Sequence, residues 1–223
     1  MKIPFIGPSY DLEAVSFDCQ RTINLYPIIS ESGTSKSVAA LRRTPGLRRF
    51  ATAPGGPVRN GFSSTSGRCF AVSAQYFVEI NADGSTTTHG SLNTQSGRVS
   101  IAENNTQIMV VDGVDGWIFT KTTNAWAQIT DSDFPVTSIV THQDGYFIVV
   151  EDGTQNMWIS ALADGFSWNA LDFTTVESSP DNLTAVISDR GNLWCFGNRS
   201  IEVYQNTGAA NFPFERIPGA IIQ

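Results

Sequence analysis

Residues 145–159 read GYFIVVEDGTQNMWI, and this stretch decides the fold. Its first half, Tyr146–Val150, is continuously apolar, as expected of a β-strand that is covered on both faces. The second half, Asn156–Ile159, alternates more. Asp-Gly pairs stand at Asp144-Gly145 and Asp152-Gly153, and another at Asp112-Gly113. Because Asp and Gly tolerate positive φ, such pairs favour tight hairpin turns. The stretch therefore predicts short antiparallel strands.

The same plan recurs four times along the chain. Apolar opening strands begin at Val58, Val99, Val136 and Leu183, which are 41, 37 and 47 residues apart. A polar turn, a second apolar strand, another turn and a third strand follow each opening strand, and no helical periodicity is convincing after residue 58. A period of roughly 40 residues with four strands per unit is typical of β-propellers rather than immunoglobulin-like sandwiches. We predict an all-β, β-propeller-like fold with blades at about 58–98, 99–135, 136–182 and 183–223.

The region before the repeats has a different composition. An apolar segment, Leu25–Ile29, precedes a Ser- and Gly-rich loop at 30–37, and residues 39–47 then run into a Pro-Gly turn. We predict an extended N-terminal arm and interface segment over residues 1–57. At the other end the fourth repeat stops on an apolar segment, 217–223. Since a closed ring of four repeats would be unusually small, we expect the chain to be truncated or part of a larger propeller.

Composition excludes several classes of function. The chain has 223 residues, of which 41% are hydrophobic and only 16% charged, a balance that suits short strands joined by many turns. Its net charge is -7. General nucleic-acid binding draws its affinity from Lys and Arg, so we expect DNA to be at most a confined cargo. No stretch has the length of a membrane span, and no secretory signal is recognisable.

Residues with catalytic or metal-binding chemistry are few. His89 and His142 are the two histidines, and neither has metal-ligand spacing. No phosphate-binding loop, dinucleotide fingerprint or nucleophile elbow occurs. Five acidic residues could suggest a calcium site or a glycosidase pair, but nearly all adjoin Gly in predicted hairpins, which explains them as turn residues: Asp112, Asp115, Asp144, Glu151 and Asp152. We predict no catalytic residue, no metal and no cofactor.

The cysteines show neither a disulfide framework nor a zinc-binding pattern. Cys19, Cys69 and Cys195 are odd in number and widely spaced, and no Cys-x-x-Cys occurs. We expect reduced, buried thiols.

A carbohydrate-related propeller is the alternative interpretation, either glycan-binding or glycan-cleaving. The segment Asp189-x-Gly191-x-x-Trp194 resembles part of the Asp-box turn of sialidases, although Ile187 occupies the position of the usual Ser. The other repeats do not copy it, so a hairpin with a packed Trp explains it. Most tryptophans recur at equivalent repeat positions, which favours core packing. Trp126 and Trp168 lie in predicted turns, where a lectin could display them.

A single strong basic cluster lies in the arm, at Arg42, Arg43, Arg48 and Arg49. Guanidinium groups could bind either DNA phosphate or an acidic neighbour. Because the cluster adjoins an arm in an otherwise acidic protein, we predict that these four arginines form a subunit interface.

Several longer segments resemble one known family. Asn24–Pro27, Leu41–Leu47, Gly97–Ser100, Asp181–Thr184 and Trp194–Gly208 are similar, in the same order, to segments of the packaged-DNA stabilization proteins of P22-like podoviruses, the tail accessory or hub proteins. The resemblance spans essentially the whole chain, although this sequence lacks the second half of the family members.

The resemblance implies a non-enzymatic structural protein of a short-tailed phage virion. Such a subunit would contain a β-propeller and assemble with itself as a ring, by resemblance a hexamer, in the host bacterial cytoplasm. Its place would be in the virion tail, below the portal and adaptor proteins and above the tail needle. There it would act as a hub or plug that stabilises packaged DNA in the head, without sequence-specific DNA binding.

Overall fold

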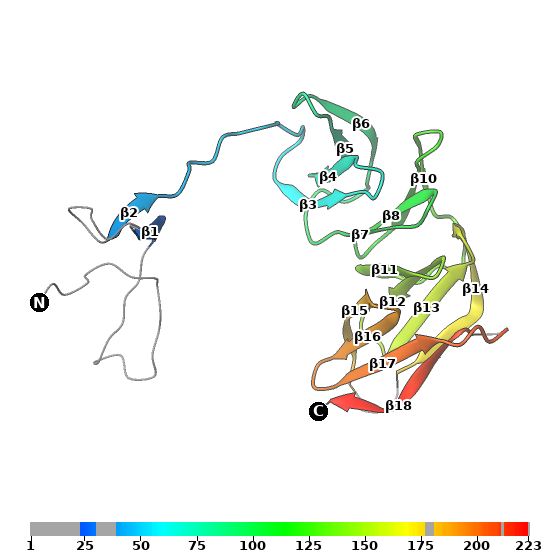
Figure 1. Cartoon of the computed structure of the whole chain (residues 1–223). Helices are drawn as coiled ribbons and strands as arrows, with labels where there is room; N and C mark the ends of the chain where they lie inside the picture. The colour runs from blue at the N-terminus through cyan, green and yellow to red at the C-terminus, as the bar shows by residue number, and fades with distance from the viewer. Residues whose placement is uncertain (1–22, 30–38, 177–180, 211, 223) are drawn as a thin grey trace, which may run out of the picture. The chain divides into compact units, whose positions relative to one another are not determined.

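The computed structural model describes residues 23–29, 39–176, 181–210 and 212–222, which form eighteen β-strands and no helix. The chain divides into two compact units, Met1–Arg49 and Phe50–Gln223. Figure 1 shows the strands of each. No helix of the described residues could cross a membrane.

The described part of the first unit is one antiparallel ribbon. Strand β1 (Leu25–Ile29) pairs with β2 (Ala39–Arg43), and Tyr26 lies opposite Arg42 in the register. The Thr44 amide donates to the Asn24 carbonyl at 3.0 Å and extends the pairing by one step. The predicted arm therefore contains a β-ribbon, followed by residues 44–49 without regular structure.

The second unit consists of four antiparallel sheets, each built from four strands that are consecutive in sequence. We call them blades 1 to 4. Blade 1 contains β3 (Val58–Ser63), β4 (Cys69–Ser73), β5 (Tyr76–Ile80) and β6 (Thr86–Ser91), and blade 2 contains β7 (Ser100–Glu103), β8 (Gln107–Val111), β9 (Gly116–Thr120) and β10 (Ala125–Gln128). Blade 3 contains β11 (Ile139–Gln143), β12 (Tyr146–Val150), β13 (Asn156–Ala161) and β14 (Asp164–Thr175), and blade 4 contains β15 (Leu183–Asp189), β16 (Asn192–Gly197), β17 (Ile201–Asn206) and β18 (Phe214–Ile222). The predicted all-β repeat architecture is confirmed.

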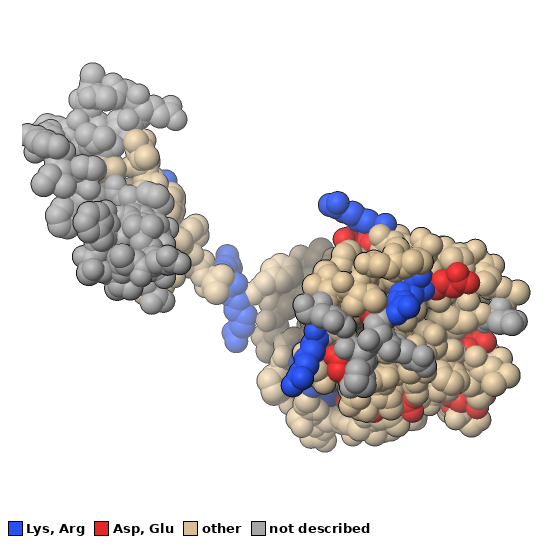
Figure 2. All heavy atoms as spheres, turned by 90° about the horizontal axis from the view of Figure 1, so that it is seen from below, with Lys and Arg blue, Asp and Glu red and all other residues tan. Residues whose placement is uncertain are grey.

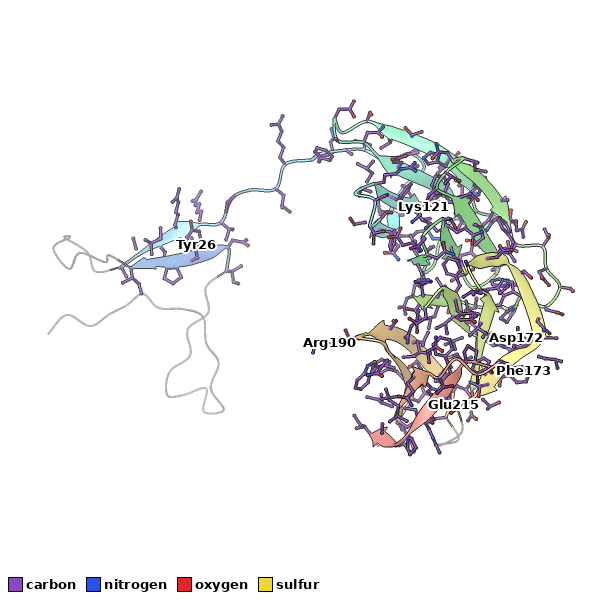
Figure 3. All side chains as sticks on the ribbon, turned by 45° about the vertical axis from the view of Figure 1, so that its right-hand side comes forward. Tyr26, Lys121, Asp172, Phe173, Arg190 and Glu215 are labelled. Carbon is purple, nitrogen blue, oxygen red and sulfur yellow. The ribbon has the colours of Figure 1, made fainter. Side chains whose placement is uncertain are left out.

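The blades stack face to face in an arc (Figure 3), and the first strands of successive blades approach one another. Each contact between blades holds its own apolar cluster, with Phe70 and Phe119 between blades 1 and 2, Ile118 and Phe147 between blades 2 and 3, and Leu193 with its neighbours between blades 3 and 4. All five residues of β8 are buried because both faces of blade 2 are covered. Burial on both faces explains the continuous apolar runs in the second strands.

One predicted turn occurs as expected, whereas one predicted strand begins later. Asp144 and Gly145 have φ of 52° and 90° and form the tight turn between β11 and β12, as predicted. The opening strand of blade 3, however, begins at Ile139 rather than at Val136. The Val136 carbonyl accepts from the Asp152 amide (2.9 Å), and the next carbonyl accepts from the Gly113 amide (3.0 Å). Residues 136 and 137 therefore hydrogen-bond to the loops at Asp152 and Gly113 instead of extending the sheet of blade 3.

The outer face of blade 1 is covered by the chain that leads into it. Ser73 Oγ donates to the Gly56 carbonyl (2.9 Å), and a Cβ on Gly84 would lie 2.6 Å from the Phe50 carbonyl oxygen. Residues 50–57, which sequence analysis places in the arm, thus lie against blade 1. Ala71 and Val78 are almost fully buried, although they lie on the face of blade 1 opposite its contact with blade 2.

The outer face of blade 4 is different. Trp194 and Phe196 point away from blade 3, opposite to the buried Leu193 and Cys195 on the same strand. On the same face, Ile187 lies opposite Trp194 and Ile222 lies opposite Ile201, and these two isoleucines are 52% and 56% exposed. Blade 4 thus presents an apolar face that no described segment covers.

Candidate functional site

The four predicted interface arginines are all exposed and lie in the first unit. Arg42 and Arg43 end β2, and adjacent strand residues point to opposite faces of the ribbon. Arg48 and Arg49 follow the Pro45-Gly46 pair. Among the described residues, no carboxylate forms an ion pair with any of them. In the view of Figure 2, the described surface of this unit carries blue side chains and no red ones.

Apolar side chains accompany these arginines. Tyr26 and Leu41 are about 40% exposed, Ile29 is 67% exposed, and Leu47 is fully exposed. A two-stranded ribbon is marginally stable by itself in water, so such a surface favours a partner. We call the described residues 23–29 and 39–49 the basic arm.

Charge is segregated between the two units. The first unit contains seven Lys and Arg against four Asp and Glu, a net charge of +3. The second contains seven Lys and Arg against seventeen Asp and Glu, a net charge of -10. The two units therefore carry net charges of opposite sign.

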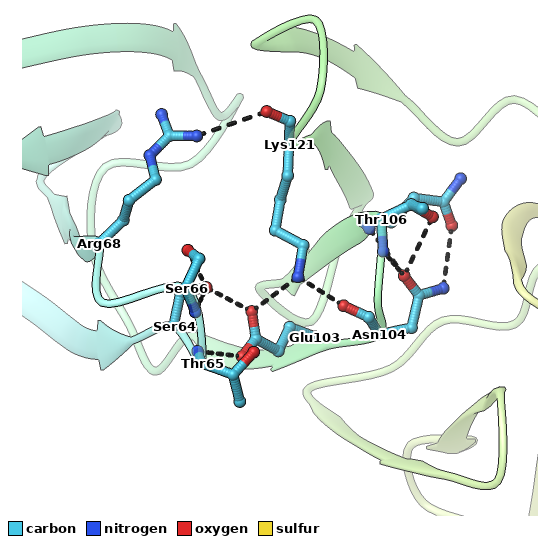
Figure 4. A network of polar contacts seen from close by, with 9 residues as sticks. Ser64, Thr65, Ser66, Arg68, Glu103, Asn104, Thr106 and Lys121 are labelled. Atoms are coloured by element: carbon cyan, nitrogen blue, oxygen red, sulfur yellow. Dashed lines mark hydrogen bonds and ion pairs between the residues drawn. The ribbon is translucent and has the colours of Figure 1, made fainter.

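A polar network connects blades 1 and 2 (Figure 4). Glu103 on β7 accepts hydrogen bonds from Ser64 Oγ (2.6 Å), the Thr65 amide (2.5 Å) and Lys121 Nζ (3.1 Å). Lys121 also donates to the Asn104 carbonyl at 2.7 Å. Burial acts to raise the pKa of Glu103, but the hydrogen bonds, first those from Ser64 and Thr65, outweigh it and lower the pKa. This carboxylate stays ionised and connects two blades.

His89 belongs to a second network, within blade 1. Arg68 makes a bidentate contact with Glu79, with both N–O distances 2.7 Å, and His89 Nε2 lies 2.9 Å from Glu79 Oε2. The Arg68 guanidinium also lies over the Phe119 ring at 5.3 Å. Hydrogen bonding from Arg68 lowers the pKa of Glu79 to about 2. Glu79 therefore binds both His89 and Arg68, an arrangement that holds strands together.

Acid should weaken this network. Because the pKa of Glu79 is about 2 in the folded state and 4.5 for an ordinary glutamate, its stabilisation is complete above pH 4.5 and is lost as the pH falls toward 2. We expect Glu79→Gln to lower the free energy of unfolding by about 1–2 kcal/mol at pH 7, since water still reaches the pair. Urea unfolding of both proteins between pH 7 and pH 2.5 measures the difference, which should shrink below pH 4.5. Asp189→Asn is the control, and a pH-independent difference would contradict the prediction.

His142 lies apart from His89, on β11 of blade 3. Its Nε2 is buried without a hydrogen-bond partner, and its ring packs edge-on against Phe147 at 5.7 Å. Burial lowers the pKa of His142, which favours the neutral ring. The structure does not bring the two histidines together.

The five acidic residues that could suggest a metal or glycosidase site each accept hydrogen bonds within the fold. Asp112 accepts from the amides of the following turn and from Thr94, and Asp152 accepts from Ser138 (2.8 Å). Asp144 accepts from the side-chain amide of Asn206 in blade 4. Asp115 accepts from Asn93 and Gln128, and Glu151 accepts from Asn156 and Trp158. Within the described ranges, no group of three His, Cys, Asp or Glu could hold a metal ion.

The two tryptophans that a lectin could display are packed. Trp126 stacks on Phe77 with centroids 4.6 Å apart, and its Nε1 donates to the Ser91 carbonyl at 3.2 Å. Trp168 is 5% exposed and donates to the Gly165 carbonyl at 2.9 Å. Neither forms an exposed aromatic platform.

The cysteine prediction is half right for the described residues. Cys195 is buried beside Met157 (S–S distance 3.7 Å), and burial raises the pKa of its thiol. Cys69, the first residue of β4, is exposed, whereas Ala71 on the same face of the strand is buried. Cys19 lies outside the described residues.

Sequence reasoning missed a groove on the propeller unit. It has a volume of about 660 Å³ and lies where blade 3 meets blade 4. Its lining includes Leu162, Leu171, Asp172 and Pro213. The third repeat is the longest, and its extra residues form the twelve-residue strand β14, which supplies two of these residues. The greater length of the third repeat was the one sequence signal that could have indicated the groove.

Four stacked four-stranded antiparallel sheets define a β-propeller protein. Comparison with known proteins identifies which kind. The family model described as "Bacteriophage P22 Gp10, beta-propeller" matches residues 1–223. The chain therefore belongs to this phage stabilisation family, whose members are structural components of the phage virion. The predicted family resemblance is confirmed.

Solved structures agree on the fold. Virginiamycin B lyase from Staphylococcus aureus is 13% identical with a TM-score of 0.53, and the match covers 87% of this chain and 63% of the lyase. The Cps50 (Swd1) β-propeller domain of Myceliophteria thermophila is 10% identical with a TM-score of 0.58, covering 78% and 61%. YCF48 bound to D1 peptide is 10% identical with a TM-score of 0.54, covering 81% and 59%. The chain thus spans less than two thirds of each propeller. No curated protein matches the sequence.

Proposed function

We propose that this protein is a hub or plug subunit in the tail of a short-tailed phage, where it stabilises packaged DNA in the head. The family match over the full 223 residues carries this proposal. In it, the chain assembles with itself as a ring, with a hexamer expected, below the portal and adaptor proteins and above the tail needle. The protein performs no catalysis in this role.

The distribution of charge supports the role. A propeller unit with a net charge of -10 repels DNA phosphates, so DNA is confined without being bound. Arg42, Arg43, Arg48 and Arg49 are the interface residues of the proposal. They are exposed and have no described acidic partner within their own chain.

We also propose that the arm covers residues 1–57 and that the four blades, over residues 58–223, form part of a larger propeller. The apolar outer face of blade 4, with Ile187 and Ile222 exposed, supports the larger ring because propeller blades bury both faces. The matched propellers, each longer than the matched region, support it as well.

DNA retention in particles tests the role. Phage particles that lack this protein should package DNA and then lose it, and counting filled and empty heads by electron microscopy measures the loss. Supplying the wild-type protein during assembly should restore filled heads. Particles that lack the protein, keep their DNA and fail to adsorb to cells would contradict the proposal and favour glycan binding.

A further inference from the structure

We propose that the basic arm of one copy docks in the groove between blades 3 and 4 of a neighbouring copy. This inference rests on the proposed ring assembly and names its contact surfaces. It assigns the occupant of the groove as residues 47–49 of the arm, a segment that reads Leu-Arg-Arg.

The groove combines apolar side chains with an unpaired acid. Leu162 and Leu171 are 63% and 80% exposed, although both line a concave surface. Asp172 also lines the groove, and no described residue hydrogen-bonds or pairs with its carboxylate. Figure 3 shows Asp172 on β14 and Glu215 on β18, the last strands of their blades. The groove therefore fits a segment that brings both an apolar side chain and a cation.

The basic arm has that composition. Leu47 is fully exposed, and Arg48 and Arg49 follow it directly. A guanidinium binds a carboxylate through two parallel hydrogen bonds, and a concave site screens the pair from water more than a flat surface does. Burial of Leu47 against Leu162 and Leu171 adds apolar contact, so the two surfaces complement each other in charge and polarity.

The topology of the contact matches a ring. Arm and groove are two different surfaces of the same chain, so the contact between copies is heterologous. Heterologous contacts form closed rings when the rotation between copies closes. Each copy then gives one arm and receives one, and ring closure strengthens contacts that are individually weak.

Charge reversal in the full chain tests the contact. Asp172→Arg should weaken self-association roughly tenfold or more, measured by light scattering across a concentration series. Asp189→Arg makes the same change in charge at the end of β15 and should leave self-association unchanged. Combining Asp172→Arg with Arg48→Asp and Arg49→Asp should restore it. Circular dichroism checks that each variant is folded.

Disulfide trapping tests whether the contact joins two copies. In a background with Cys19→Ser and Cys69→Ser, a tagged copy with Leu47→Cys is mixed with a differently tagged copy with Leu171→Cys. Oxidation should yield a disulfide between the two tags. Wild-type rings that tolerate Asp172→Arg and give no such disulfide would overturn this inference and leave the ring proposal standing. A wild-type chain that never self-associates would overturn both.

Discussion

Replacing Phe119 by alanine should lower the free energy of unfolding of the propeller unit by about 3–5 kcal/mol. Phe119 is fully buried at the contact between blades 1 and 2. Its ring centroid lies 5.3 Å from that of Phe70, 5.5 Å from that of Phe77 and 4.7 Å from that of His89. Alanine would leave a cavity that blades 1 and 2 can close only by moving against each other.

Urea unfolding, followed by tryptophan fluorescence, measures this loss. The stacked pair Trp117 and Trp126, with centroids 5.5 Å apart, reports on the same contact. Val114→Ala is the matched control, because Val114 is 60% exposed in a loop of blade 2 and its truncation should change stability by less than about 0.5 kcal/mol. A loss below about 1 kcal/mol for Phe119→Ala would show that the blades are not held together by this cluster.

The double variant Arg42→Glu with Arg43→Glu should abolish ring assembly. Each reversal changes the charge by two, so the net charge of the first unit falls from +3 to -1. An acidic arm would then meet a propeller unit of net charge -10, and attraction between copies becomes repulsion. Both side chains are exposed at the end of β2, so the fold should tolerate the change.

Light scattering on the purified chain and DNA retention in complemented particles measure this effect. The control is Arg98→Glu with Arg190→Glu, which makes the same change in charge at two exposed positions of the propeller unit. The control should assemble, and raising the salt concentration should weaken the wild-type rings. Rings of unchanged size in the arm variant would refute the interface role of these arginines.

Much of the fold follows from local sequence. The apolar run Tyr146–Val150 and the turn at Asp144-Gly145 occur as predicted, because strand alternation and tight turns depend on neighbouring residues. The opening strand of blade 3 was predicted to begin at Val136 but begins at Ile139, because the Val136 carbonyl accepts from the amide of Asp152, sixteen residues away.

Some candidate site residues could likewise be found from local sequence, and others only from the tertiary structure. Sequence alone located the arginine cluster, since runs of charge are visible without a structure. It could not show that Cys69 is exposed, because an apolar covering segment protects only part of the outer face of blade 1. It also could not locate the groove that contains Leu171 and Asp172, whose lining joins side chains from two blades.

The amino-acid sequence by itself determined that this protein is a repeated, acidic, all-β chain with a basic arm, and its motifs matched its family. Only the tertiary structure decided which side chains meet across blades. Ser64 meets Glu103 and Ser100 meets Val140, pairs 39 and 40 residues apart, or about one repeat. The physical reason is that hairpins are fixed by local backbone geometry, whereas contacts between blades depend on how whole sheets stack.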